Sequence, residues 1–308
     1  MIAALTGGTG GAKLVEGLAC TLDPAELTII CNTGDDAIFH GLYVAPDIDT
    51  IIYTLAGLID SEKGWGIGGE TFAVLQQLRC LGEDTWFNLG DKDLATHIVR
   101  TRLLGEGRKL SQVVDHICRA LGVASKILPM SDDRVETRVT TRQGEISFQE
   151  FFVKERWTPE VLAVHFAGAA QSRPAPGVLD AIRDAEAVIV CPSNPITSIG
   201  PILAVPGIRA ALNETDARII GVSPILGATA ISGPAHKLML AGGREPSASS
   251  VARSYDDFLD AFLIAEEDFA LARQIENLQI DAVCTNIRMP TRADKQRLAR
   301  EVLAWVKK

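Results

Sequence analysis

A glycine-rich stretch near the start of the chain limits its fold more than any other feature. The apolar run Ile2–Leu5 ends at the sequence Thr6–Gly11, which holds four glycines, and leucines at helical spacing follow at Leu14 and Leu18. A second apolar run, Leu27–Cys31, comes next. Strand, helix and strand in this order form a β-α-β unit, whose two strands pair in parallel. The sequence therefore predicts an α/β protein built on a parallel sheet.

Later segments repeat the alternation of strand and helix. Apolar runs at Ala187–Cys191, Ile219–Val222 and Ala261–Ala265 alternate with helical segments such as 177–185 and 207–212. We therefore expect a doubly wound, mostly parallel, Rossmann-like sheet with ligand loops at the carboxyl ends of its strands. The final segment, Arg292–Lys308, has one apolar face and is expected to dock as a helix.

The middle of the chain has a different pattern. Residues 82–122 are mainly helical in pattern, and Val135–Val153 alternates like two strands around Gln143 and Gly144. We expect residues 57–166 to form an inserted α+β subdomain, and residues 1–56 and 167–308 to form the Rossmann-like nucleotide- and phosphate-binding core.

Charge and composition exclude several classes of protein. The chain carries 30 Lys and Arg against 39 Asp and Glu, a net charge of −9, which disfavours a protein that binds nucleic acid or an anionic membrane. Four prolines interrupt its longest uncharged stretch, residues 187–208, so that stretch is no membrane helix. The first residues lack the basic region of a signal peptide. The six cysteines show no C-x-x-C spacing and are expected to be reduced thiols. A cytoplasmic protein is predicted.

The glycine stretch is expected to bind phosphate, because backbone N–H groups at the start of a helix can approach an anion closely there. The loop is not a Walker A motif, since Leu14 replaces the magnesium-binding Ser or Thr. It also departs from G-x-G-x-x-G, because Lys13 takes the last position. Asn32 stands where a dinucleotide-binding domain needs an acidic residue for the ribose, which disfavours NAD. A tight turn without a ligand is the alternative.

Four carboxylates lie close together in the sequence after the second strand. Asp35 and Asp36 follow the strand directly, and Asp47 and Asp49 come about ten residues later. Magnesium prefers such oxygen ligands and is usually held by one or two carboxylates plus substrate phosphates. Asp35 and Asp36 are the better candidates, because Asp47 and Asp49 are explained almost as well by capping of a helix or turn.

Two further groups of polar residues are candidates for ligand binding. Asp93, His97 and Arg100 share one helix face, where they would bind a phosphorylated or polyhydroxyl ligand or would simply form a solvated surface. Ser193 and Asn194 follow a strand at the carboxyl edge, with Thr197 and Ser198 close behind. A nucleotide is expected to lie beside these four residues.

Together these blocks resemble the 2-phospho-L-lactate transferase family (CofD/FbiA) of deazaflavin coenzyme F-420 biosynthesis. The resemblance runs nearly end to end, and one position departs mildly from it, because Asp133 stands where Glu is more often expected. The blocks that carry it are Thr6–Lys13, Asn32–Asp36 with His40 and Gly41, Pro46–Thr50, Gly64–Gly66 with Glu70 and Thr71, Leu89–His97, Ser131–Thr137 and Pro192–Pro201.

The resemblance implies a magnesium-dependent transferase. Such an enzyme moves a 2-phospholactyl, enolpyruvyl phosphate or phosphoglyceryl group from a guanosine diphosphate donor to the ribityl hydroxyl of the deazaflavin Fo and releases GMP. Mg²⁺ is the implied cofactor, and a homodimer is expected. The sequence does not decide among the three donors, nor which Asp binds the metal and which orients the hydroxyl.

The resemblance also implies a role for each candidate residue. The catalytic candidates are Asp35, Asp36 and Asp49, of which Asp35 and Asp49 are also the metal candidates. The phosphate-binding candidates are Gly7, Gly8, Thr9, Gly10, Gly11 and Lys13. The nucleotide-binding candidates are Ser193, Asn194, Thr197 and Ser198. The candidates on the deazaflavin side are Asn32, Glu70, Asp91, His97, Arg100 and Glu136.

Two alternatives stand beside this interpretation. The related gluconeogenesis-factor-like proteins share the glycine loop and the paired Asp, and would make the chain a nucleotide-sugar-binding regulatory protein. The blocks Gly64–Gly66 and Leu89–His97 favour the transferase branch instead. A nicotinamide oxidoreductase is the second alternative, which Lys13 and Asn32 disfavour.

Overall fold

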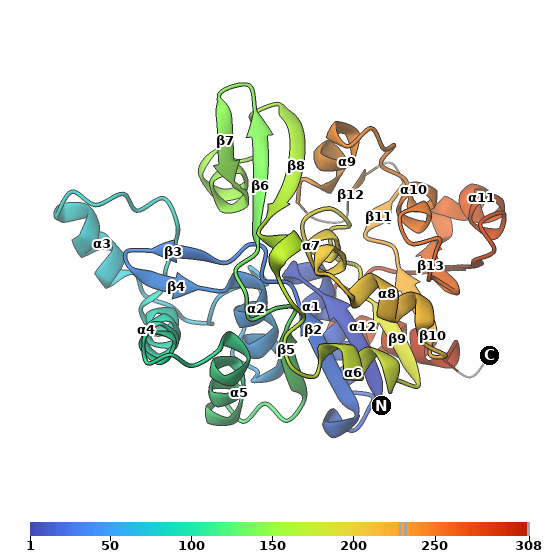
Figure 1. Cartoon of the computed structure of the whole chain (residues 1–308), viewed down its shortest axis with the longest axis horizontal. Coiled ribbons are helices and arrows are strands. Elements are labelled where there is room, and N and C mark those ends of the chain that lie inside the picture. The colour runs from blue at the N-terminus through green and yellow to red at the C-terminus, as the bar shows by residue number, and fades with distance from the viewer. Residues whose placement is uncertain (228, 231–232, 307–308) are drawn as a thin grey trace.

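The computed structural model describes residues 1–227, 229–230 and 233–306 and confirms the α/β class. Within these residues, parallel strands form a seven-stranded central sheet in the order β14-β13-β10-β9-β1-β2-β5 (Figure 1). The strands are β1 (Ile2–Thr6), β2 (Leu27–Cys31), β5 (Lys126–Pro129), β9 (Ala187–Val190), β10 (Arg218–Val222), β13 (Ala261–Ala265) and β14 (Asp281–Thr285).

Helices cover both faces of this sheet because its strands are apolar on both sides. In β1, Ala3 and Leu5 point into one core, whereas Ile2 and Ala4 point into the other. The first core is completed by α6 (Val178–Arg183), α7 (Ile199–Ala204), α8 (Ile208–Glu214), α9 (Ala235–Ala241), α10 (Ala248–Arg253) and α11 (Ala272–Glu276). The second is completed by α1 (Gly8–Ala19), α2 (Pro46–Leu55), α5 (Leu110–Ala120) and α12 (Arg292–Ala304), the expected C-terminal helix. Its expected last two residues lie outside the described part of the chain.

The topological switch point lies at β1. The chain passes from β1 to β2 on one side, and later returns to β9 on the other side, where Ile2 pairs with Ala187. The loops that follow these two neighbouring strands, β1 and β9, therefore lead away from each other at the carboxyl edge of the sheet. Open α/β sheets bind their ligands in the crevice that such a divergence leaves.

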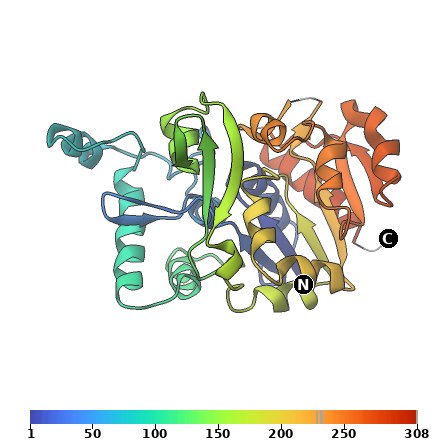
Figure 2. The same cartoon turned by 45° about the horizontal axis from the view of Figure 1, so that its top comes forward.

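The middle of the chain supplies elements that stand away from the sheet. A projecting arm holds the hairpin of β3 (Ala37–Phe39) and β4 (Leu42–Val44), with α3 (Ala73–Cys80) and α4 (Asp91–Gly105), as Figures 1 and 2 show. A small antiparallel sheet has the order β7-β6-β8, from β7 (Gly144–Ser147), β6 (Glu136–Thr141) and β8 (Val161–Ala167). The predicted helical stretch and hairpin are thus present.

The proposed division of the chain at residues 57 and 166 stays a prediction. One element from inside that range, β5, is an edge strand of the central sheet and pairs with β2 through Ile127 and Ile29. The small sheet and the helices α3 and α4 lie outside the central sheet, whereas the hairpin of the arm, β3 and β4, precedes the range (Figure 1).

Short elements complete the described chain. They are the 3₁₀-helices η1 (Pro24–Glu26), η3 (Ala169–Gln171) and η4 (Glu266–Leu271), the π-helix η2 (Glu150–Lys154), and the strand pair β11 (Ile225–Leu226) and β12 (Thr229–Ala230). Among the described residues, no helix is both long enough and apolar enough to cross a membrane.

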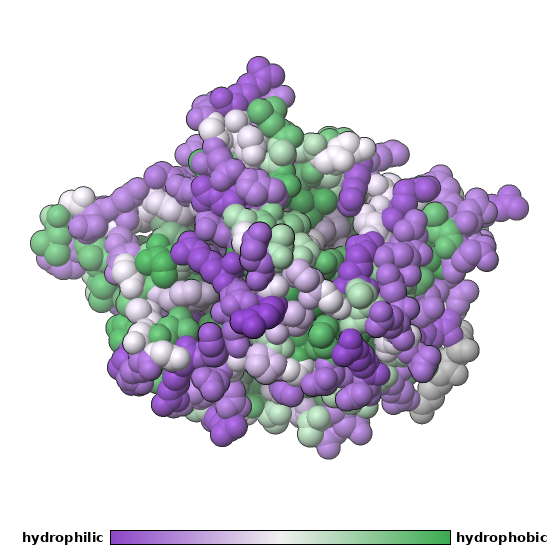
Figure 3. Space-filling view, in the orientation of Figure 1, coloured by the Kyte–Doolittle hydropathy of each residue, from purple (hydrophilic) through white to green (hydrophobic). Residues whose placement is uncertain are grey.

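Apolar side chains gather on one exposed part of the surface, over β8 and α7 (Figure 3). A hollow of about 470 Å³ lies there, and Leu162, Val164 and Phe166 contribute to its lining.

Candidate active site

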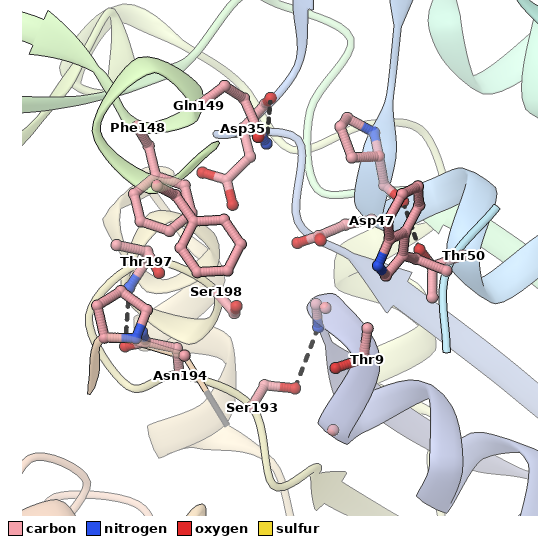
Figure 4. Close-up of a pocket in the computed structure, with 18 of the residues that line it drawn as sticks. Thr9, Asp35, Asp47, Thr50, Phe148, Gln149, Ser193, Asn194, Thr197 and Ser198 are labelled. Atoms are coloured by element: carbon pink, nitrogen blue, oxygen red, sulfur yellow. Dashed lines mark hydrogen bonds between the residues drawn. The ribbon is translucent and has the colours of Figure 1, made fainter. Parts of the chain in front are cut away.

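A cavity of about 410 Å³ lies at the switch point, against the carboxyl edge of the sheet (Figure 4). The loop after β1 and the loop after β9 form one side of it. The start of α2 and the segment that begins η2 complete the enclosure, so that Asp47 and Thr50 lie across the cavity from Phe148 and Gln149. The expected ligand loops therefore meet at a single site.

The glycine loop fits this place because side chains would collide there. A Cβ on Gly7 would lie 2.5 Å from Asp47 Oδ2 and 2.8 Å from Ser198 Cβ, closer than real Cβ contacts. Gly8 has a φ of +64°, which glycine adopts without cost. The Gly7 N–H donates to Ser193 Oγ at 3.2 Å, which joins the loops after β1 and β9.

Two carboxylates, Asp35 and Asp47, point into this cavity (Figure 4). Burial raises the pKa of Asp47 to about 6, although the Asn32 amide and the Gly8 N–H oppose that rise. Burial and the negative charge of Asp47 raise the pKa of Asp35 well above its usual range. Asp35 Oδ1 is buried without a hydrogen-bond partner among the described residues. A buried oxygen without a hydrogen-bond partner has a lone pair that can bind a cation.

Among the described residues that line the cavity there is no Lys, Arg or His. Lys13, predicted to bind phosphate, has an exposed side chain and is not part of the lining, and neither is Gly11. A polyanionic ligand would therefore meet two carboxylates and backbone N–H groups here, with no basic side chain to balance its charge.

The predicted nucleotide residues do line the cavity. Ser193, Asn194, Thr197 and Ser198 lie in the loop after β9, and Thr9 faces them from the start of α1 (Figure 4). Asn194 Oδ1 accepts from the Ile196 N–H at 2.9 Å, which holds the loop in a tight turn.

Asn32 supports the cavity from behind and is not among its lining residues. Its Nδ2 donates to Asp47 Oδ2 at 2.9 Å and to the Thr197 carbonyl at 3.1 Å, while its Oδ1 accepts from the Gly34 N–H at 2.8 Å. Asn32 thus orients Asp47 and joins it to the loop after β9. In the sequence, this role of Asn32 is marked only by the lack of an acidic residue at the position where a dinucleotide site needs one.

Asp49 lies on the other side of α2, in a buried network with α4. Both Asp49 oxygens accept from the Arg100 guanidinium, which is fully buried. Arg100 Nη1 also lies 3.2 Å from His97 Nδ1. Because a guanidinium only donates, Nδ1 is the acceptor, and the proton of a neutral His97 is on Nε2, 3.3 Å from Asp93 Oδ2.

This network contains a possible metal-binding group, since one ligand atom each of Asp49, Asp93 and His97 lie within 4.8 Å of one another. Arg100 already neutralises Asp49, and Tyr53 donates to Asp93 at 2.6 Å. None of these residues lines the cavity. The metal role expected for Asp49 stays a prediction.

The remaining candidates are held by contacts outside the cavity lining. Asp36 accepts from the Tyr43 hydroxyl at 2.8 Å, and burial raises the pKa of Asp36 well above its usual range. Glu136 forms ion pairs with Arg138 at 2.7 Å and Arg134 at 3.1 Å.

Glu70 and Asp91 hold the beginnings of two helices. Glu70 accepts from the Lys92 and Asp93 N–H groups at 2.8 and 2.7 Å, at the start of α4. Asp91 accepts from the Ala73 and Val74 N–H groups at 2.9 and 3.1 Å, at the start of α3. The two carboxylates therefore cap helices reciprocally.

Aromatic residues form a part of the cavity that the sequence interpretation did not include. Phe87, Phe148 and Phe152 line it together with Trp65. Trp65 lies within one of the blocks that carry the family resemblance, whereas no local pattern marks the other three as ligand-facing. Gln149 and Thr50 were also missed.

The chain matches known proteins over most of its length. The family model described as 2-phospho-L-lactate transferase CofD matches residues 2–307. A phosphoenolpyruvate transferase from Streptomyces griseus is 47% identical over 281 residues, 89% of this chain and 88% of its own. A 2-phospho-L-lactate transferase from Methanothermobacter thermautotrophicus is 44% identical over 306 residues, 99% of this chain and 98% of its own.

A solved structure supports the fold. A protein member of the UPF0052 family from Bacillus halodurans matches with a TM-score of 0.66 at 16% identity and covers 98% of both chains. From the match over nearly its whole length, the chain belongs to the 2-phospho-L-lactate transferase CofD family.

Proposed function

We propose that this protein transfers a phosphorylated three-carbon acid from a guanosine diphosphate donor to the terminal ribityl hydroxyl of the deazaflavin Fo, in the biosynthesis of coenzyme F-420. Because it belongs to the CofD family, the chain is a transferase, and the proposal concerns what it transfers and to which acceptor. The charge of the cavity is the observation that supports the proposal most directly.

That charge calls for a metal ion. Asp35 and Asp47 face the cavity, and no basic side chain is among its described lining residues. A diphosphate would be repelled there unless a divalent cation bridged it to the carboxylates. Asp35 and Asp47 would hold Mg²⁺, and the ion would neutralise charge that develops on the diphosphate during transfer. Asp47 thus takes the place that the sequence interpretation gave to Asp49.

The residues of this chain then position the reactants. The N–H groups at Gly8–Gly10 begin α1 and suit the diphosphate, while Ser193 and Asn194 suit the guanosine side of the donor. The ribityl hydroxyl oxygen forms a bond to the phosphorus that carries the acid. The bond from that phosphorus to the oxygen of GMP breaks, and the hydroxyl proton is released. Holding the hydroxyl in line with the leaving oxygen supplies much of the rate.

The proposal is tested by incubating the protein with Fo, Mg²⁺ and each of the lactyl, enolpyruvyl and glyceryl donors, and weighing the products. We expect GMP and a phosphodiester-linked deazaflavin, with the deazaflavin absorbance unchanged because no redox step occurs. GMP release that does not depend on Fo, or no release with any donor, would refute the proposal.

The same assay identifies the donor, which sequence identity does not. Relatives named for phospholactate and for phosphoenolpyruvate are 44% and 47% identical to this chain. We expect lactyl and enolpyruvyl donors to compete closely. They differ by a methyl against a methylene group, and in an apolar pocket such a change alters the binding free energy by only about 1 to 3 kcal/mol. A glyceryl donor should be much better or much worse, since a pocket that hydrogen-bonds a hydroxyl discriminates by about 10⁴. The proposed homodimer is checked by light scattering.

A further inference from the structure

The turn that follows the π-helix η2 has an unusual backbone. Arg156 and Trp157 are consecutive, and their φ angles are +50° and +47°. The left-handed region is unfavourable for L-residues with side chains, and they rarely occupy it in pairs. Contacts from outside the turn are therefore needed to hold it.

Lys237 of α9 supplies such contacts. Its Nζ donates to the Trp157 carbonyl at 2.8 Å and to the Thr158 carbonyl at 2.9 Å. The same ammonium lies 6.0 Å from the ring centroid of Phe151, where a cation is attracted to the aromatic face. A lysine is a common partner for carbonyls that a helix end leaves unpaired.

The turn that Lys237 holds sets the position of an aromatic stack. The Trp157 ring stacks on Phe152, with centroids 5.3 Å apart and an interplanar angle of 25°. Phe152 stacks on Phe148 at 5.5 Å and 11°. Phe148 and Phe152 line the cavity, whereas Trp157 and Lys237 lie behind them and do not. Nearly parallel rings thus connect the turn to the cavity wall.

We propose that Lys237 is a positioning residue for ring binding. By holding the turn at Arg156 and Trp157, it keeps the stacked rings in place, so that Phe148 and Phe152 form an aromatic wall of the cavity against which the planar ring of a substrate packs. The proposal rests on the proposed function, which supplies two planar rings, a deazaflavin and a guanine. The ring that uses the wall is identified by the substrate whose binding changes.

The test compares Lys237→Met with Lys237→Arg, and uses Lys154→Met as the matched control. Lys154 is the last residue of η2, next to the turn in sequence, but its ammonium binds Asp84 at 3.2 Å and not the turn. In Lys237→Met we expect the KM of one ring substrate to rise about tenfold, the difference that stacking on one aromatic side chain supplies. The other KM and kcat should stay within about twofold. Lys237→Arg should bind like wild type, since it keeps the donors, and so should Lys154→Met.

A second variant separates this role from a general loss of stability. Glycine adopts a φ of +50° without cost. Arg156→Gly added to Lys237→Met should therefore bring the raised KM back to the wild-type value. Unchanged KM values in Lys237→Met, a fall in kcat alone, or no restoration by Arg156→Gly would overturn the proposal. If Lys237→Met fails to fold, Arg156→Gly added to it must restore both folding and ring affinity.

Failure of the proposed function gives a different result. In that case wild-type protein would show no transfer with any donor. The affinities of Fo and GDP, measured by thermal shift in the presence of Mg²⁺, then provide the same comparison among the variants. Equal affinities of wild type and Lys237→Met for both ligands would overturn the positioning role independently of turnover.

Discussion

The buried carboxylate of Asp47 opposes folding while it prepares the cavity for a cation. Its pKa is about 6 in the folded protein, and about 3.9 is usual for an unfolded chain. Between these two values the unfolded state loses its proton first, so Asp47 lowers the free energy of unfolding as pH rises from about 4 to 6. Above pH 6 the full cost, about 3 kcal/mol, is present.

Replacing Asp47 should therefore separate stability from activity. We expect Asp47→Asn, without Mg²⁺, to unfold with a free energy about 1 to 3 kcal/mol larger than wild type at pH 7.5, and to equal wild type near pH 4. Its kcat should fall by at least about 10², because the metal loses a charged ligand. Urea unfolding at several pH values measures the first effect. A variant less stable than wild type at pH 7.5 would contradict the argument.

Asp35 should show the metal dependence most directly. Asp35→Asn keeps the shape of the side chain but removes the charge, so we expect kcat to fall by about 10² or more and the Mg²⁺ concentration for half-maximal rate to rise. The neighbouring Asp36→Asn is the matched comparison, since Asp36 does not line the cavity. Near-normal turnover of Asp35→Asn at low Mg²⁺ would exclude a metal role, provided that its melting temperature is preserved.

The residues that sequence analysis could place are those tied to strand ends. The glycine loop and Ser193 directly follow β1 and β9, so their position at the carboxyl edge was predictable. No such rule places Glu70 and Asp91, because a carboxylate that caps a helix looks the same in sequence as one that faces a ligand. Phe148 reaches the cavity only through tertiary packing, which leaves no local pattern.

At the scale of whole elements, one buried ion pair holds α4 against α2. Arg100 is fully buried and contacts Asp49, whereas Arg119 and Asp115 form an exposed pair within α5. Removing one partner of a buried pair leaves an uncompensated charge, which costs about 3 to 5 kcal/mol, but an exposed pair contributes about 0 to 1 kcal/mol.

We therefore expect Arg100→Met to lower the free energy of unfolding by about 3 to 5 kcal/mol, and Arg119→Met to change it by less than about 1 kcal/mol. Adding Asp49→Asn to Arg100→Met should recover part of the loss, because the orphaned carboxylate is then removed. Chemical denaturation of the four proteins measures these differences. Equal losses for Arg100→Met and Arg119→Met would show that the pair is not coupled to folding.

Strand and helix alternation predicted the inner strands of the central sheet well because they are buried on both faces and read as continuous apolar runs. β13 (Ala261–Ala265) occupies the residues that were expected. The sequence analysis did not identify β5, because Lys126 begins it and Pro129 ends it, and only its pairing with β2 makes it part of the sheet. Pairing between distant segments is a tertiary property that no window of sequence contains.

For the molecule as a whole, the acidic cavity predicts that ligand binding depends on metal. GDP with Mg²⁺ at about 100 times its Kd should stabilise the fold by about 2.7 kcal/mol, which corresponds to a rise in Tm of roughly 4 °C for a chain of 308 residues. GDP with EDTA should raise Tm little, because the carboxylates repel it. NAD serves as the negative control. An equal rise for GDP with and without Mg²⁺ would contradict the metal requirement.

The position of β1 in the sheet also determines how long one of its edges stays unpaired during synthesis. β1 leaves the ribosome well before its neighbour β9, which begins at Ala187 and pairs with one of the two edges of β1. At about 5 to 20 residues per second, that edge waits roughly 10 to 40 s for its neighbour. Throughout this interval the nascent chain displays an apolar, unpaired strand edge, the kind of surface to which chaperones and other unfinished chains adhere. The strand order that creates the crevice at the switch point therefore leaves one edge of β1 unprotected until β9 has been translated.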